Sequence, residues 1–575
     1  MLREVWLRQP LKEAELAEML AVHGDLLRPL AAARAEAMLW RGRAADAEPM
    51  LSLLPDERRA LLRARIALIR GQEPDLSAIP AALRDDPGLA HDRFARLAAE
   101  GRYSEALAIL QARTGSAAAL GEPDRWAAWR AQIARWLMRE GRHQEAYAIA
   151  AAHHLTEPSE SHADLEWLAG YLALRFLDEP AGALEHFRRS EALVRGPISL
   201  ARAAYWQGRA EEALGRPDEA AIAYARGARH QTAFYGLLSA EKLGLPLDPI
   251  LTGQEDFGDW RTSGRLAGDL PRAMLLLLAA GERADARLFA LALARSLDRE
   301  GVGQLAALLE EMHESHLAVL VGKAAVEQGI VVPAAYFPLH PMARGDWPVD
   351  TALALSIARR ESEFDAAARS PVGAQGLMQL MPATAREVAG WLGLPYSAAR
   401  LNEWDYNVRL GTRYLHHLEE QFGTSPVLIA AGYNAGPGRP RQWLAERGDF
   451  RDGSVDVVDW IEHIPFTETR IYVMRVAESI PVYRARLTGE TGPVQFTALL
   501  RGAPPLIRPV ARPDPAAAAA TGAVERLSTA SVPEAVAQAV AAGPEVGSQA
   551  EAPARQVAPQ TVDPLLRPLN RPDPD

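Results

Sequence analysis

A short phrase built on Gly, Arg, Glu and Ala recurs in the first half of this chain, between stretches with a helical pattern. Full copies stand at 101–106, 141–146 and 215–220, and a shorter echo stands at 208–213. In each copy the glycine ends one helix, and the small alanine lets the next helix pack closely against it. The first two copies start 40 residues apart (101 to 141), and the next follows 74 later (141 to 215). The phrase therefore indicates a degenerate repeat of helical hairpins.

Stacked helical hairpins form a curved solenoid in which each unit packs against its neighbours. Ala and Leu dominate the composition, and long stretches lack the alternation that is typical of strands. We therefore predict an all-α chain whose N-terminal part is a curved α-solenoid of helical hairpins. An irregular helical bundle is the alternative interpretation of the same residues.

At 575 residues the chain is too long for one hydrophobic core, and its composition divides it into four parts. Residues 1–244 carry the repeated phrase, whereas 245–344 are helical without it, which predicts a helical linker subdomain. Glycines and aromatic residues punctuate short helices over 345–490, which predicts a separate compact domain. Residues 491–575 contain 14 prolines, and they are too poor in aromatic residues to bury a core. That last segment is predicted to be a disordered tail.

Charge and residue usage exclude several classes of function. The net charge is -11 and no block of Lys and Arg stands out, which argues against nucleic acid as a partner. The chain has no Cys, so it can form neither a disulfide nor a thiolate nucleophile. The longest apolar run, 273–280, is too short for a transmembrane segment. No metal or nucleotide motif is present, and His416 and His417 are expected on a solvated helix face, so we predict no metal and no cofactor.

One carboxylate lies on the apolar face of a predicted helix in the third part. Asp350 can cap a helix that runs to about residue 362. The residues that share one face of this helix are Leu353, Ile357, Glu361 and Phe364. Desolvation on such a face would raise the pKa of Glu361, as a general acid requires. A salt-bridged structural glutamate would show the same pattern, so the position alone predicts no catalyst.

Three further motifs follow this glutamate. A glycine-punctuated loop at 370–379 leads to Pro382, which can start a helix at its first position. A Ser-Pro pair opens a later helix that ends in Tyr433 and Asn434, where both side chains could face a groove. Glu468 lies in the first turn of a fourth, amphipathic helix, where dipole stabilisation is its simplest role.

These four motifs, in this order, resemble the soluble lytic transglycosylase family. They read Glu-Ser, Gly-Leu-Met-Gln, Ala-Gly-Tyr-Asn-Ala-Gly-Pro and Glu-Thr-Arg-x-Tyr-Val, and they cover about 345–487. The helical N-terminal half is similar to the superhelical domain and linker of that family. The resemblance implies a C-terminal lysozyme-like domain. It also implies an enzyme that cleaves peptidoglycan glycan strands between N-acetylmuramic acid and N-acetylglucosamine, leaving 1,6-anhydromuramic ends.

The resemblance also implies roles for particular residues. Glu361 would protonate the glycosidic oxygen and then act as base on the muramic 6-hydroxyl. The residues implied to bind or support the substrate are Ser370, Gln379, Met381, Tyr433, Asn434 and Glu468. No cofactor is implied.

The implied reaction needs only one acidic residue. Ordinary glycosidases need two carboxylates, whereas attack by a tethered hydroxyl needs no separate nucleophile. Of the acidic neighbours, Glu363 is expected to point away from Glu361. Asp365 is expected to be a turn residue after the helix end.

Two other functions remain open at this point. A hydrolytic muramidase of the goose-lysozyme type shares the single-glutamate architecture, and a non-catalytic scaffold could hold glycan while the solenoid binds protein partners. The substrate implied by the resemblance lies in the periplasm, yet the chain begins without an apolar export segment. We therefore expect that the solenoid is N-terminally incomplete, because the start is truncated or misassigned.

Overall fold

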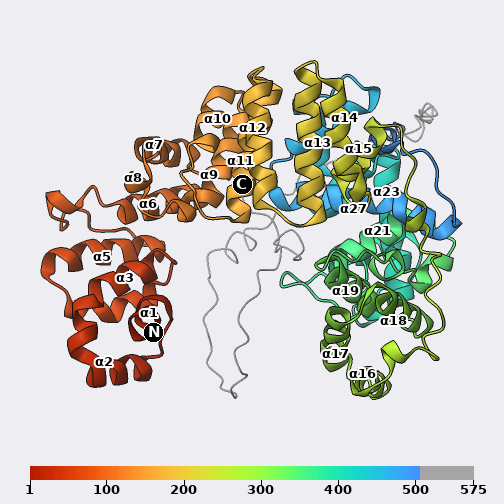
Figure 1. The fold of residues 1–575 in the computed structure, drawn as a ribbon, viewed down its shortest axis with the longest axis horizontal. Helices are drawn as coiled ribbons and strands as arrows, with labels where there is room; N and C mark the ends of the chain where they lie inside the picture. Colours follow the sequence, from red (N-terminus) through yellow and green to blue (C-terminus); the bar gives the residue numbers. More distant parts are fainter. Residues whose placement is uncertain (505–575) are drawn as a thin grey trace, which may run out of the picture.

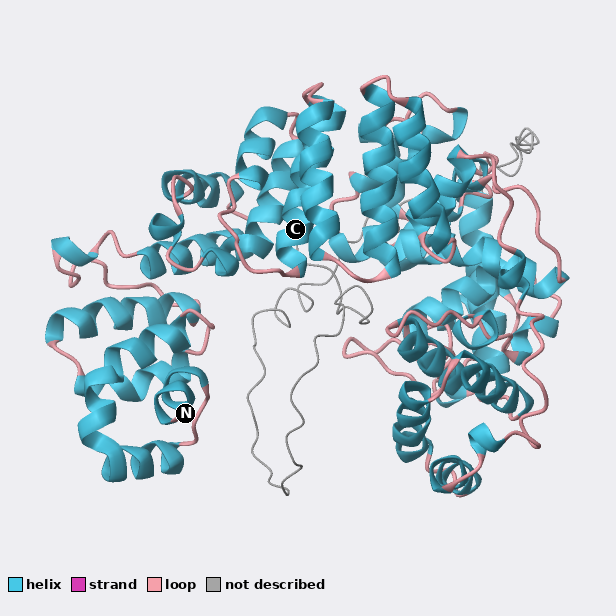
Figure 2. Ribbon diagram, viewed as in Figure 1, coloured by secondary structure: helices cyan, strands magenta, loops and turns pink. Residues whose placement is uncertain are grey.

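The structure is a computed structural model, and it describes residues 1–504. All regular elements in that range are helices (Figure 2), with three isolated β-bridges between loop segments. The predicted all-α class is therefore confirmed. Within the described part, no helix is long and apolar enough to cross a membrane. Most of the predicted tail, 505–575, lies outside the described residues.

The helices follow one another along an open arch (Figure 1). An N-terminal block stands at one end, the solenoid forms the top, and the linker and the C-terminal domain form the other end. The N-terminal block consists of α1 (Leu2–Arg8), α2 (Glu13–Leu27), α3 (Ala31–Leu39), α4 (Ala44–Ala47) and α5 (Asp56–Ile69). The solenoid consists of α6 (Pro87–Ala99), α7 (Tyr103–Arg113), α8 (Ala117–Leu120), α9 (Pro123–Arg139), α10 (His143–Ala151), α11 (Glu160–Phe176), α12 (Pro180–Leu193), α13 (Pro197–Ala213), α14 (Pro217–Gly227) and α15 (Phe234–Lys242).

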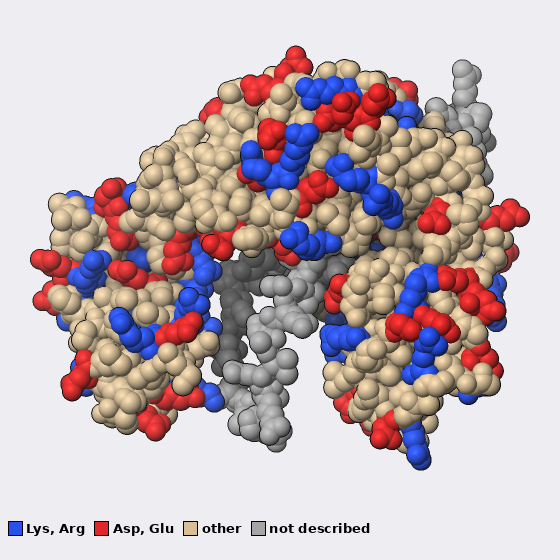
Figure 3. All heavy atoms as spheres, in the orientation of Figure 1, with Lys and Arg blue, Asp and Glu red and all other residues tan. Residues whose placement is uncertain are grey.

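The second half of the chain forms the linker and the C-terminal domain. The linker consists of α16 (Asp269–Ala279), α17 (Arg283–Ser296), α18 (Arg299–Glu311), α19 (Ser315–Val326) and α20 (Pro333–Tyr336). The C-terminal domain consists of α21 (Thr351–Ser362), α22 (Pro382–Trp391), α23 (Trp404–Phe422), α24 (Pro426–Ala435), α25 (Gly438–Arg447), α26 (Val457–Glu462) and α27 (Thr467–Thr488), with α28 (Phe496–Arg501) after it. Basic and acidic side chains are interspersed over the face shown in Figure 3.

The repeated phrase makes the turns that its sequence predicts. Gly101, Gly141 and Gly215 adopt left-handed φ values of 73°, 73° and 70° between consecutive helices. The alanine five residues after each glycine is buried. The same turn also occurs at Gly42 and Gly281, so it extends beyond the copies found by sequence.

The prediction for the echo at 208–213 is wrong. Gly208 lies inside α13 and ends no helix. A Cβ atom there would come within 2.4 Å of the Tyr224 ring on α14. The glycine is therefore needed because α13 and α14 approach closely, a packing role that the local sequence does not distinguish from a turn.

The solenoid and the C-terminal domain share one continuous apolar core, which runs from Ala90 to Leu500. The linker and the N-terminal block have separate cores. Polar contacts reinforce the shared core at α26. Arg135 on α9 donates to the Glu462 carboxylate at 3.2 Å, and Tyr171 on α11 donates to Asp459 at 3.0 Å. These contacts therefore fix the C-terminal domain against the solenoid.

The prediction of disorder from residue 491 onward is wrong for 491–504. Phe496 and Leu500 of α28 are buried, and the Phe496 ring packs against Phe234 with centroids 5.2 Å apart. The backbone N–H of Thr497 donates to the Glu241 carboxylate at 2.9 Å. The buried side chains of Phe496 and Leu500 thus give this short segment enough apolar surface to dock.

Candidate active site

A cleft of about 790 Å³ opens in the C-terminal domain, bounded mainly by α21, α24, α27 and the loop before α22. Ile198 at the start of α13 and His316 and Lys323 on α19 also line it. Every site residue predicted from the sequence lies within 345–490. The structure instead shows that the solenoid and the linker each supply part of the wall.

The seven residues singled out by sequence all line this cleft. They are Glu361, Ser370, Gln379, Met381, Tyr433, Asn434 and Glu468. The four motifs are far apart in the chain, and the fold brings them to one cavity. Their individual roles remain proposals.

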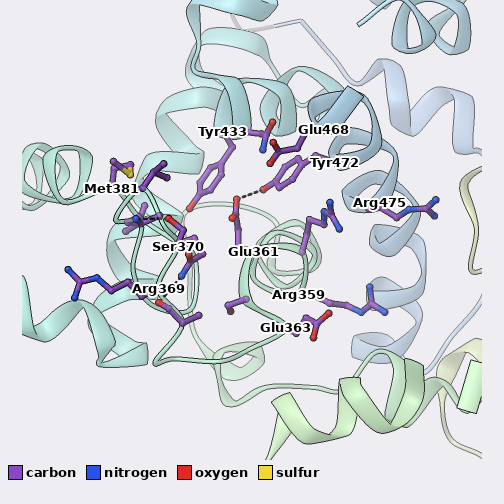
Figure 4. Close-up of a pocket in the computed structure, with 18 of the residues that line it drawn as sticks. Arg359, Glu361, Glu363, Arg369, Ser370, Met381, Tyr433, Glu468, Tyr472 and Arg475 are labelled. Atoms are coloured by element: carbon purple, nitrogen blue, oxygen red, sulfur yellow. Dashed lines mark hydrogen bonds between the residues drawn. The ribbon is translucent and has the colours of Figure 1, made fainter. Parts of the chain in front are cut away.

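Glu361 lies in the last turn of α21. As predicted, the Asp350 side chain caps this helix by accepting from the N–H of Ala352 at 2.9 Å, and the helix ends at Ser362. The Glu361 carboxylate is half-buried and accepts a hydrogen bond from the Tyr472 hydroxyl at 2.7 Å. Figure 4 shows it directed into the space between Tyr433 and Tyr472.

The chain turns sharply after α21 through two left-handed residues. Glu363 has φ 54° and Phe364 has φ 66°, a conformation that is strained for residues other than glycine. Phe364 is buried, but it lies beyond the helix end, so its predicted place on the helical face with Glu361 is wrong. Asp365 accepts from the N–H of Ala367 at 2.9 Å, as expected of a turn residue.

The linker holds this turn from outside. The Lys323 ammonium donates to the Glu363 carboxylate, and His316 Nδ1 donates to the Glu363 carbonyl at 3.0 Å. Figure 4 shows the Glu363 side chain directed away from Glu361, as predicted. Contacts of α19 therefore fix the backbone immediately after Glu361.

The loop at 370–379 folds through its own polar side chains. Ser370 Oγ accepts from the N–H of Ala374 at 2.9 Å. Gln379, itself left-handed with φ 46°, donates through Nε2 to the carbonyls of Ala368 and Gly376, both at 2.9 Å. Both residues therefore shape the cleft wall.

Gly376 and Asn407 join this loop to α23. A Cβ at Gly376 would lie 2.0 Å from the carbonyl oxygen of Leu401 and 2.3 Å from Asn407 Nδ2, and its φ is 78°. Asn407 accepts from the N–H of Met378 at 2.8 Å and donates to the carbonyls of Leu401 and Gln375. Only glycine fits this close approach.

Tyr433 and Asn434 end α24, as predicted, where Gly436 stops the helix. The Tyr433 hydroxyl donates to the carbonyl of Met378 at 2.8 Å, and Asn434 Oδ1 accepts from Thr469 Oγ1 at 2.6 Å. These bonds join the end of α24 to the loop on one side and to α27 on the other.

Met381 and Glu468 stand at the beginnings of two helices. Met381 is the residue before α22, which begins at Pro382 as predicted, and its side chain is half-buried. Glu468 lies in the first turn of α27, beside Tyr472 (Figure 4).

The two phenols around Glu361 are locked in the protonated form. Burial, and then the negative charge of Glu361, raise the pKa of Tyr472 and of Tyr433 well above the ordinary value for tyrosine. Tyr472 is therefore a neutral hydrogen-bond donor at any working pH. Arg360, whose guanidinium lies 5.9 Å from the Tyr472 ring centroid, has its pKa lowered by burial and by the charge of Arg475.

Tyr472 and Asn407 are site residues that were not predicted from the sequence. Tyr472 stands one helical turn after Glu468 inside the Glu-Thr-Arg-x-Tyr-Val motif, so helical spacing could have selected it. Asn407 lies in no motif. Its role depends on the approach of α23 to the loop, for which the sequence carries no local signal.

Among the described residues, one group has the composition of a metal site. The ligand atoms of His153, His162 and Glu166 lie within 4.8 Å of one another. Glu166 is already bonded to His186 Nδ1 at 2.6 Å and to Arg189 Nε at 3.0 Å. His153 Nδ1 accepts from the N–H of Leu155, so its Nε2 carries the proton and donates to Glu166. This arrangement is a hydrogen-bonded network in the solenoid, distinct from the cleft, and the absence of a metal remains a prediction.

Residues 340–454 match the family described as the transglycosylase SLT domain. The soluble lytic murein transglycosylase of Escherichia coli K12 is 40% identical over 154 residues, which are 26% of this chain and 23% of that protein. The endo-type membrane-bound lytic murein transglycosylase A of Klebsiella pneumoniae 342 is 29% identical over 164 residues, 25% of this chain and 80% of that protein. The alignment thus spans about a quarter of the length of the Escherichia coli relative.

Two solved structures share the fold over most of the chain. The 70 kDa soluble lytic transglycosylase of Escherichia coli superposes with a TM-score of 0.64 at 23% identity, covering 88% of this chain and 80% of that one. The lytic transglycosylase Slt of Pseudomonas aeruginosa, solved as an inactive Glu-to-Gln mutant, superposes with a TM-score of 0.62 at 25% identity, covering 85% and 78%. The predicted architecture, a helical superhelix joined to a lysozyme-like domain, is confirmed.

Proposed function

We propose that the chain is a peptidoglycan lytic transglycosylase of the soluble lytic transglycosylase family, because residues 340–454 match the SLT domain and the fold is shared over most of the chain. It would cleave the β-1,4 bond between N-acetylmuramic acid and N-acetylglucosamine and leave a 1,6-anhydromuramic end. The observation that carries the proposal is the position of Glu361, at the end of α21 in the cleft and hydrogen-bonded to Tyr472.

In the proposed reaction, Glu361 works first as an acid and then as a base. It gives its proton to the glycosidic oxygen as the bond from that oxygen to muramic C1 breaks. The 6-hydroxyl of the same muramic ring then attacks C1 and forms the anhydro bond, while its proton passes to the Glu361 carboxylate. One proton leaves the residue and one returns, so the enzyme is regenerated and no water is consumed. The attacking hydroxyl is tethered to the ring, which supplies a large effective concentration.

Tyr472 is proposed to position the Glu361 carboxylate. Its hydroxyl stays protonated and donates to Glu361 Oε1, which favours the ionised form that must develop when the proton is transferred. A carboxylate held by a fixed donor keeps its orientation in the cleft.

Three other carboxylates lie in the cleft wall, those of Glu363, Glu468 and Glu478. Glu363 is bound by Lys323 and faces away from Glu361, and Glu478 is bound by Arg475 at 2.8 Å. An ordinary glycosidase needs a second carboxylate as nucleophile or water-activating base. Glu363 and Glu478 are therefore not proposed for that role, and Glu468 is proposed to bind sugar hydroxyls, which leaves ring closure as the proposed mechanism.

The remaining predicted residues are proposed to hold the sugars. Ser370 and Gln379 fix the loop, while Gln379 Oε1 and Asn434 Nδ2 take no part in the bonds that fix their side chains. These atoms can meet hydroxyl and acetamido groups of the strand. Met381 offers apolar surface at the cleft edge, and Glu468 is proposed as an acceptor for sugar hydroxyls. The substrate class implies that the reaction takes place in the periplasm.

Digestion of purified sacculi, followed by mass spectrometry of the products, tests the proposal. The expected products are 1,6-anhydro muropeptides, and Glu361→Gln should lower their rate of release by at least about a thousandfold. Glu446→Gln, an exposed change on α25 in the same domain, is the matched control and should digest as the parent does.

The products also separate the competing functions. Reducing muropeptides would replace the proposal with hydrolytic muramidase activity of the goose-lysozyme type. Binding of sacculi without release of any product by the parent protein would make the chain a non-catalytic scaffold.

A further inference from the structure

Trp391, at the end of α22, is the one exposed side chain among the Phe, Trp and Tyr residues of the described part of the chain, with 39% of its surface open. All 13 tryptophans lie within residues 1–504, and the other twelve are buried or half-buried. A lone exposed apolar side chain is common on protein surfaces. The surroundings of Trp391 therefore decide whether it has a role.

A row of rings connects Trp391 to the cleft. The ring centroids of Trp391 and His417 are 4.7 Å apart, those of His417 and Tyr414 are 6.4 Å apart, and those of Tyr414 and Tyr433 are 5.5 Å apart. Tyr414 and Tyr433 both line the cleft. Trp391, His417 and Tyr414 are called the aromatic row below.

The aromatic row lies where α22 packs against α23. Thr384, Glu387 and Trp391 are spaced i, i+3 and i+7 on α22, and Tyr414 and His417 are spaced i and i+3 on α23, so each set shares a helical face. Thr384 lines the cleft, and Trp391 stands two turns beyond it, about 10 Å along the helix. Burial raises the pKa of Tyr414, and the charge of Glu387 raises it further, so that carboxylate also faces the row.

The groups along the row have the chemistry of a sugar site. The guanidinium carbon of Arg413 lies 5.4 Å from the centroid of Trp391, and Gln421 Nε2 lies 2.6 Å from His417 Nε2. A pyranose ring has an apolar face of C–H groups that packs on a flat aromatic ring, and equatorial hydroxyls that need donors and acceptors around its edge. The Arg413 guanidinium lies over one face of the indole, which leaves the other face for a sugar, and Glu387 shares the helix face of Trp391.

We propose that the aromatic row binds a further sugar of the glycan strand whose cleavage site occupies the cleft, with Trp391 stacked on the apolar face of that sugar. The inference rests on the proposed function, because it takes the cleft to hold a β-1,4-linked chain of N-acetylated aminosugars. It assigns a binding surface that extends the cleft from Tyr414 to His417 and Trp391, which do not line the cleft themselves, in a segment where the four sequence motifs contribute no residue. Affinity should therefore increase with strand length until the strand covers Trp391.

Binding of β-1,4-linked N-acetylglucosamine oligomers of increasing length to the full chain tests this inference. The measurements use the Glu361→Gln background, so that no oligomer is cleaved during titration. Trp391→Ala should weaken binding of the longest oligomers about threefold to tenfold and remove most of the gain in affinity with length. Trp391→Phe keeps a smaller ring and should lose less.

Leu276→Ala is the matched control, because Leu276 is 62% exposed on α16 in the linker. It should bind every oligomer as the parent does. Tryptophan fluorescence gives a second readout that does not depend on affinity. Iodide should quench the fluorescence of Trp391 more readily than that of the buried tryptophans. Long oligomers should protect Trp391 from this quenching, whereas short oligomers should not.

An unchanged length dependence in both Trp391 variants, or unprotected emission with a long oligomer bound, would overturn the inference. Digestion of sacculi by the parent protein would then still support the proposed function, so the two failures are distinguishable. Absence of oligomer binding at every length would overturn the inference together with its premise.

Discussion

The solenoid turns and the cleft both depend on left-handed backbone, but different residue types adopt it. In the repeated turn the left-handed positions are glycines, with open space around each absent Cβ: Gly101, Gly141 and Gly215. Around Glu361 the left-handed positions are Glu363, Phe364 and Gln379. Glycine adopts this conformation without a steric penalty, whereas other residues are strained by about 1 kcal/mol or more each.

Strain of this kind persists only where the surroundings hold it. Glu363 is held by Lys323 of the linker, and the Phe364 ring stacks on His340 with centroids 5.4 Å apart. Gln379 is held by its own amide bonds to the loop. The solenoid turn needs no such support, so it can recur along the chain. The cleft is a single assembly of distant parts, and substitutions there should affect activity as well as stability.

The largest expected contrast is between two Gly-to-Ala substitutions. At Gly376 the new methyl group would meet the Leu401 carbonyl and the Asn407 amide, so Gly376→Ala should destabilise the domain by about 3 kcal/mol or more and abolish digestion of sacculi. Gly101→Ala meets nothing within 4 Å and should lower stability by only about 1 kcal/mol, with activity retained. Urea unfolding and sacculus digestion measure both. Equal losses in the two variants would contradict the comparison.

The next largest effect concerns His340, which supports the left-handed turn. Burial lowers the pKa of His340 to about 4, and its neutral Nδ1 accepts from the N–H of Met342. The unfolded chain takes up this proton at higher pH than the folded chain. The contribution of His340 to stability is therefore complete above about pH 6.5 and is lost as the pH falls towards 4, by up to about 3 kcal/mol.

Urea unfolding at about pH 7 and about pH 4.5 measures this effect. His340→Gln retains an acceptor for Met342 but does not titrate, so its stability should fall less with pH than that of the parent. The same pH dependence in parent and variant would show that His340 is not the group responsible.

Tyr472→Phe tests the donor to Glu361 with a smaller change. Loss of one hydrogen bond to a carboxylate should reduce activity about tenfold to a hundredfold. The alkaline limit of the pH–rate profile should move upward, because the anion loses a donor. Tyr396→Phe is the matched control, since the Tyr396 hydroxyl has no hydrogen-bond partner within residues 1–504. A variant whose pH profile matches the parent would remove Tyr472 from the mechanism.

The smallest effect should come from Glu363→Gly. This substitution replaces a strained residue with glycine, which occupies the left-handed positions of the solenoid turns. Relief of strain offsets the lost contact with Lys323, so stability should change by less than about 1 kcal/mol. Activity should fall about fivefold, because the backbone after Glu361 is held less firmly. Lys323→Met keeps the strain and removes the contact, so it should destabilise the protein. Full activity of Glu363→Gly would show that the strained turn does not position Glu361.

The parts of the fold that depend on residues close together in the sequence could be predicted. The cap at Asp350, the helix start at Pro382 and the glycine turns each follow from local hydrogen bonding or backbone freedom. Predictions failed where distant packing decides the outcome. Gly208 serves the contact between α13 and α14, and Phe496 orders a proline-rich segment by docking on the solenoid.

The sequence by itself determined an all-helical chain with a repeated hairpin turn, and it determined which four motifs carry the candidate site. Those features depend on caps, turns and periodicity, which act within a few residues. Only the tertiary structure decided that Tyr472 meets Glu361, that Lys323 of the linker holds the strained turn, and that the solenoid shares its core with the C-terminal domain. These contacts join residues far apart in the chain, so they exist only after the helices have packed against one another.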